Sequence, residues 1–221
     1  MFEPAHDQAA GLRQLFRAGR PALLPLGCTS GDAAERAAVA ALAQALTRAG
    51  HRPVLVDLLG GTVPEGAFAC VDADRLLGHG AGARELLALI RSLRGRAAGG
   101  FDVVLVAADP LRLADLTAGV AQRIVLVGRA QRSGLAHAYA QVKALHLAHG
   151  LGDYVTAFLD ADSPASALAW HRRLADAAAR FLGVAVEFGG VLAARADRGD
   201  RDRFALDALG WSSPMPVSVL R

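Results

Sequence analysis

Short apolar runs, bounded by Gly, Pro or Asp, alternate with longer stretches of helical periodicity along most of the chain. The apolar runs have the length and the boundaries of buried strands. They cover residues 22–26, 53–57, 103–107, 124–127, 155–159 and 185–188, with a weaker candidate at 67–71.

Helical patterns fill the intervals between these runs and predict helices at 33–49, 83–93, 113–121, 134–149 and 163–182. Ser163 and Pro164 form a start signal, because a hydroxyl can cap free amides and proline fits the first helical position. The Gly-rich stretch 58–82 is long enough to be a mobile loop. Residues 211–221 hold Pro214 and Pro216, and we expect them to be extended.

Strands that alternate with helices are typical of a parallel sheet covered on both faces. We therefore expect a doubly wound, three-layer α/β fold. The chain has 221 residues, of which 53% are hydrophobic, so it can bury a full core, and its length favours one globular domain over two.

The charge, the cysteines and the absence of long apolar stretches limit the classes of function that the chain can have. The formal net charge is +3 and the arginines are spread along the chain, so no basic stripe indicates nucleic-acid binding. Cys28 and Cys70 match no metal spacing, and we expect both to be buried or half-buried thiols of a reducing compartment. No signal peptide or stretch of 18 apolar residues is present, which predicts a cytoplasmic protein.

The first strand, a turn at Thr29-Ser30-Gly31 and an Ala-rich helix form the opening unit of a nucleotide-binding fold. A phosphate loop needs glycines, whose amides curl around the anion, and a lysine. The only lysine of the chain is Lys143, far from this turn. Asp32 and Glu35 instead place negative charge where the anion would lie. Arg36 could supply a cation, but a guanidinium differs in geometry from a lysine ammonium.

Several strings resemble the MinD/ParA group of P-loop ATPases and, within it, the flagellar-number regulators FlhG and FleN. The chain is similar to their DQAxxLR signature at residues 7–13, to the TSG before their phosphate loop at 29–31, to their AYALIK helix at 138–143 and to their RFLGV at 180–184. The first and last strings are the more specific. The resemblance spans nearly the whole chain and implies a P-loop NTPase-like fold.

The same resemblance implies that the catalytic positions are lost. Asp57 matches the first aspartate of the family's LDAD segment, but Leu59 stands where an acid should orient water. Ala107 replaces a Mg²⁺-linked aspartate, and Asp109 lies two positions late, where a strand-end turn explains it better. We expect a pseudo-ATPase without a cofactor or metal, whose degenerate site comprises Thr29, Ser30, Gly31, Asp32, Arg36, Asp57 and Ala107. An active ATPase that uses Arg36 is the alternative.

Residues 1–20 form a separate unit ahead of the α/β domain at 21–221. Asp7 is a plausible helix cap, and Leu12, Leu15 and Phe16 share one face at helical spacing. This face could pack on the protein's own sheet, which would fit a scaffold that reuses the fold. The resemblance implies instead that the helix binds an FlhF-type signal-recognition GTPase and stimulates it, through the partner-binding residues Asp7, Gln8, Ala9, Leu12, Arg13, Leu15 and Phe16.

Other candidate sites are weaker. His146 and His149 lie three residues apart but lack a carboxylate partner, so a solvated helix face is favoured over a metal site. Asp160 and Asp162 fit turn and cap positions. Residues 203–211 predict weak membrane binding or none. The resemblance also implies a monomer, other flagellar basal-body proteins as further partners, and recruitment to the cell pole or flagellar base.

Overall fold

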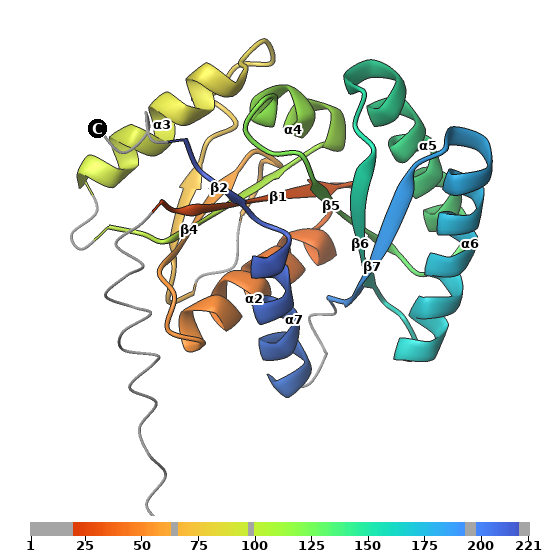
Figure 1. The fold of residues 1–221 in the computed structure, drawn as a ribbon. Helices are drawn as coiled ribbons and strands as arrows, with labels where there is room; N and C mark the ends of the chain where they lie inside the picture. Colours follow the sequence, from red (N-terminus) through yellow and green to blue (C-terminus); the bar gives the residue numbers. More distant parts are fainter. Residues whose placement is uncertain (1–19, 63–65, 97–99, 193–197, 217–221) are drawn as a thin grey trace, which may run out of the picture.

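A computed structural model describes residues 20–62, 66–96, 100–192 and 198–216 of the chain. Within them the strands form one sheet in the order β3-β2-β4-β1-β5-β6-β7, all parallel, and the short β8 pairs antiparallel with the start of β1 (Figure 1). The strands are β1 (Ala22–Cys28), β2 (Pro53–Asp57), β3 (Ala69–Asp72), β4 (Val103–Ala108), β5 (Ile124–Arg129), β6 (Asp153–Leu159), β7 (Ala185–Val191) and β8 (Ser213–Pro214).

Helices cover both faces of this sheet (Figure 1). Four of them pack on one face: α3 (Ala83–Arg96), α4 (Pro110–Thr117), α5 (Arg132–His149) and α6 (Pro164–Leu182). The opposite face is covered by α2 (Ala33–Arg48) and α7 (Arg198–Gly210). The expected three-layer, doubly wound α/β fold is therefore confirmed.

Side-chain alternation along the strands explains the two apolar layers. Val104 and Val106 of β4 pack beneath α3 and α4, whereas Val103 and Leu105 face α2. Successive residues of a strand point to opposite faces, so a strand covered on both sides must be apolar at every position. The buried runs of the central strands meet this requirement.

The sequence predicted six of the strands at nearly their observed positions, and the weak candidate at 67–71 is confirmed as β3. The prediction for α4 was wrong in its bounds, because Asp109 caps this helix and Pro110 occupies its first turn. The stretch 58–82 is not one long loop, because it contains β3. Cys70 is exposed rather than buried or half-buried, since it lies on an edge strand, whereas Cys28 is buried.

Residues 203–210 lie in α7, and Trp211 follows the last residue of this helix. Phe204, Ala205 and Ala208 are buried against the sheet, and the ring of Phe204 lies 5.5 Å from that of Trp211, centroid to centroid. Only Leu206 among the large apolar side chains of this helix is prominently exposed. The apolar residues of this segment therefore belong mainly to the core.

The carboxyl ends of β1, β4 and β5 meet in the middle of the sheet. The chain leaves β1 towards β2 on one side, and β5 follows on the other, so the strand order reverses at β1. Open α/β sheets bind ligands at such a switch point, beyond the carboxyl ends of the strands. The turn after β1 occupies this position.

Candidate functional site

The turn after β1 joins Cys28 to the first residue of α2, Ala33. Gly31 has a φ of 61°, a left-handed conformation that glycine adopts without strain. Asp32 then caps the helix by accepting hydrogen bonds from the amides of Ala34 and Glu35. The expected Thr29-Ser30-Gly31 turn is thus present, and its amides turn towards the first turn of α2.

These amides bind the carboxylate of Glu35. The amides of Ser30 and Gly31 donate to Oε2 at 3.0 and 2.7 Å, and the Thr29 hydroxyl donates to Oε1 at 3.0 Å. Glu35 has an exposed fraction of 0%. Successive amides at a turn and a helix N-terminus form an anion-binding nest, and here a side chain of the same helix fills it.

Charge balance at the turn is completed by Arg129, the last residue of β5. Its guanidinium bridges Asp32, with Nη2 at 2.5 Å from Oδ2, and Asp160, which follows β6. Partial burial opposes ionisation of Asp32, but the hydrogen bond from Arg129, helped by the capping amides, lowers its pKa to about 2. The bond to Asp32 also raises the pKa of Arg129.

These ion pairs span the carboxyl ends of three neighbouring strands, β1, β5 and β6. Asp160 is the only non-glycine residue with positive φ, at 53°, among the described residues. Aspartate tolerates this conformation better than most side chains. The predicted turn role of Asp160 is confirmed, but its pairing with Arg129 was missed, because the two residues are 31 positions apart.

Arg36 does not face outward as a free cation. Its Nη1 donates to the carbonyl oxygen of Gly31, and the guanidinium lies against Gly61. The Nε atom is buried and has no hydrogen-bond partner among the described residues. The Arg36 side chain therefore interacts with the backbone of Gly31 and Gly61 and not with an anion.

The remaining candidate positions lie on neighbouring strand ends. Asp57 is buried at the end of β2 and accepts a hydrogen bond from the amide of Leu59 at 3.0 Å. Burial raises its pKa, helped by nearby Asp72. Ala107 is buried in β4 and brings no polar group to the edge. Asp109 accepts from the amides of Leu111 and Arg112, which confirms the predicted strand-end role.

Cys28 ends β1 directly beneath the turn. Burial raises the pKa of its thiol well above the usual value, and the carboxylates of Glu35 and Asp57 raise it further. A thiolate is the reactive form of cysteine, so this thiol is inert at neutral pH. Cys28 therefore contributes packing to the site and no chemistry.

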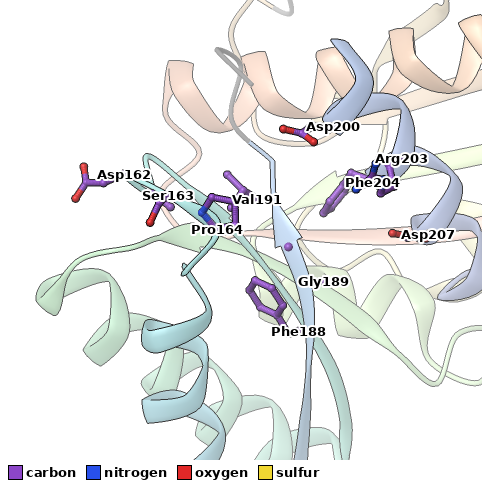
Figure 2. A pocket seen from close by; sticks show the side chains of 12 residues that line it. Asp162, Ser163, Pro164, Phe188, Gly189, Val191, Asp200, Arg203, Phe204 and Asp207 are labelled. Atoms are coloured by element: carbon purple, nitrogen blue, oxygen red, sulfur yellow. The ribbon is translucent and has the colours of Figure 1, made fainter. Parts of the chain in front are cut away.

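A cavity of 560 Å³ lies further along the same edge, between the start of α6, the end of β7 and α7. Figure 2 shows Phe188 and Phe204 beside this cavity, with Asp200 and Arg203 on α7. Its apolar wall can pack a flat group, but Asp162, Asp200 and Asp207 outnumber its single arginine. This charge disfavours phosphate.

The remaining predictions concern metal binding, membrane binding and partner binding. In the described ranges, no group of three or more His, Cys, Asp or Glu side chains could hold a metal ion. The same ranges contain no helix that combines the length and apolarity needed to cross a bilayer. The partner-binding residues Asp7, Gln8, Ala9, Leu12, Arg13, Leu15 and Phe16 lie outside the described residues.

Comparisons with known proteins define the class of fold. No family model and no curated protein sequence matches the chain. Among solved structures, MinD from Aquifex aeolicus matches with a TM-score of 0.51 at 12% identity, over 88% of this chain and 99% of that one. A plasmid partition protein from Borrelia burgdorferi gives 0.52 at 9% identity, over 85% and 97%.

The chloroplast FtsY of Physcomitrella patens gives a TM-score of 0.52 at 16% identity, over 86% of this chain. The match spans 65% of that FtsY's length. The chain therefore has the P-loop NTPase-like fold that MinD/ParA-type proteins and FtsY share. At these identities the likeness establishes the fold, and function depends on the residues at the site.

Proposed function

We propose that this protein is a non-catalytic, FlhG-like regulator of flagellar placement or number. In this proposal it binds an FlhF-type signal-recognition GTPase through its N-terminal helix and modulates the partner's GTP hydrolysis. It acts as a monomer without a cofactor and is recruited from the cytoplasm to the cell pole or flagellar base.

The observation that carries the non-catalytic part is the position of Glu35. A nucleotide phosphate needs the amides of Ser30 and Gly31, and both already bind the Glu35 carboxylate. An incoming phosphate would meet a buried negative charge instead of free donors. No lysine is near to offset that charge, because the only one, Lys143, is on α5.

Arg36 argues against the alternative of an active ATPase with an arginine in place of lysine. Its guanidinium is engaged with Gly31 and Gly61, and Asp32 is held by Arg129. A nucleotide would have to break these interactions and displace Glu35 together. The absence of an acid at Leu59 and at Ala107 adds to this argument.

The partner half of the proposal rests on the string at residues 7–13, which is similar to the activator signature of the FlhG family. A short amphipathic helix binds a groove through a few apolar anchors. In this assignment Leu12 and Arg13 anchor the helix, with Leu15 and Phe16 on the same side, and Gln8 reaches the GTPase site.

The test is GTP turnover by an FlhF-type GTPase in the presence of the full-length protein. Leu12→Ala should weaken binding by roughly 1–3 kcal/mol if its side chain is a buried anchor. Gln8→Ala should leave binding intact and lower the stimulated rate, because a catalytic contact forms mainly in the transition state.

Two variants serve as matched controls. Gln14→Ala changes the same residue type within the same segment, outside the 7–13 string, and should alter neither binding nor turnover. Leu147→Ala removes a leucine that is 70% exposed on α5. If wild-type protein neither binds the GTPase nor changes its turnover, the regulator proposal fails and the scaffold alternative gains.

A further inference from the structure

A small groove lies at the amino-terminal edge of the sheet, opposite the site described above. It has a volume of 300 Å³ and is lined by residues 47, 51–54, 67–69, 71, 93, 100 and 101, which we call the amino-edge groove. Phe68, Leu93 and Phe101 give it an apolar lining, and the start of β2 and β3 forms its floor.

This groove is small for a ligand site. Pockets for small molecules usually measure about 300–1,000 Å³ and carry convergent polar groups. The amino-edge groove stands at the lower limit, and most of its side chains are apolar. Its size and lining fit one or two apolar side chains of a polypeptide.

The N-terminal segment begins its exit from the sheet close to the groove. Ala22, the first residue of β1, pairs with Val103 of β4, and Val103 pairs with Pro53, which lines the groove. Two strand spacings separate Ala22 from Pro53, about 10 Å. Figure 1 places the start of β1 and the start of β4 on the side of the sheet where α3 ends.

The N-terminal segment is long enough to reach the amino-edge groove and carries apolar side chains that match its lining. Leu15 precedes Ala22 by seven residues, which span about 10 Å as a helix and about 23 Å when extended. Both lengths reach the groove. Leu12, Leu15 and Phe16 recur at helical spacing, so one apolar face can be presented to it.

We propose that residues 12–16 dock in the amino-edge groove of their own chain, with Phe16 or Leu15 inserted between Phe68, Leu93 and Phe101. The proposal concerns the free protein and does not depend on the identity of any partner. A GTPase that binds Leu12 and its neighbours would have to displace this docked state, so docking lowers the apparent affinity for such a partner.

The other end of the chain is a poorer occupant. Residues 217–221 follow β8, which pairs with Ala22 and Leu23 on the edge of β1 that faces away from β4. The C-terminal stretch also has five residues, against nineteen at the N-terminus.

The experiment is amide hydrogen exchange, followed by mass spectrometry, on four full-length proteins. Wild type should protect the amides of residues 10–17 from exchange by about tenfold or more relative to Phe16→Asp. Ala69→Asp should lose the same protection, because it adds a charge to the groove wall at an exposed alanine. Ala185→Asp should retain it, since Ala185 is an exposed alanine on the opposite edge strand, β7.

Three results would overturn the proposal. The first is unprotected exchange at residues 10–17 in wild type. The second is protection that Phe16→Asp abolishes but Ala69→Asp leaves intact, which would place the segment elsewhere on the molecule. The third is an Ala69-dependent protection of residues 217–221 instead, which would make the C-terminal stretch the occupant. The exchange experiment uses this protein alone, so its outcome does not depend on whether the protein stimulates a GTPase in the turnover assay.

Discussion

Single residues decide what the turn after β1 can bind. Glu35 lies in the first turn of α2, where a carboxylate also interacts favourably with the helix dipole. Its three hydrogen bonds come from one turn, and none of its surface is exposed. Removal of this side chain leaves two backbone amides in a buried site without an acceptor.

We predict that Glu35→Ala lowers the free energy of unfolding by roughly 1–3 kcal/mol, the cost of unsatisfied buried donors. Urea unfolding followed by circular dichroism measures the change. Glu85→Ala is the matched control, because Glu85 also lies in the first turn of a helix and accepts one amide, from Gly82, but is partly exposed. Equal losses in the two variants would contradict a special role for Glu35.

The lowered pKa of Asp32 predicts that the free energy of unfolding depends on pH. Its folded pKa of about 2 lies below the usual value of 3.8, so ionised Asp32 stabilises the fold above pH 4, and this contribution is lost as the pH falls through about 2. Its side chain is 36% exposed, so solvent screening reduces the expected contribution to about 1 kcal/mol.

Asp32→Asn isolates this contribution, because asparagine keeps the helix cap and removes the charge. The difference in unfolding free energy between wild type and this variant should be about 1 kcal/mol at pH 6, should fall as the pH drops below 4, and should vanish only below about pH 2. Urea titrations at a series of pH values measure it. A difference that stays constant with pH would show that Arg129 does not stabilise the ionised carboxylate.

At the scale of elements, α7 distinguishes a core helix from a membrane-binding one. Phe204 of this helix is 4% exposed and lies in the buried cluster on the sheet, whereas Leu206, two positions later, is 55% exposed. The sequence of 203–211 could not separate these roles, because both require apolar residues at helical spacing. Only the packing of α7 beside α2 assigns Phe204 to the core.

We predict that Phe204→Ala destabilises the protein by about 3–5 kcal/mol, through lost burial and the cavity left behind. Leu206→Ala, on the exposed side of the same helix, should change stability by less than about 0.5 kcal/mol. Thermal and urea unfolding compare the two. If Leu206→Ala proves as costly as Phe204→Ala, the assigned faces of α7 are wrong.

At the scale of the whole molecule, the sequence predicted the layered fold and the place of the turn, because both follow from local periodicity. It also located negative charge at Asp32 and Glu35. It did not separate their roles: one caps α2 and binds Arg129, and the other fills the nest. Arg129 and Asp160 are distant from Asp32 in the sequence, and the ion pairs of Arg129 with both aspartates require the register of neighbouring parallel strands.

The most direct test of the account is calorimetric titration of the full-length protein with ATP and Mg²⁺ at neutral pH. Because the Ser30 and Gly31 amides already bind Glu35, and Arg36 is engaged with Gly31, we predict no binding heat up to millimolar nucleotide. Saturable binding with a Kd near 1 μM, about 8 kcal/mol of binding free energy, would contradict the account, because Glu35 would then have to leave the turn.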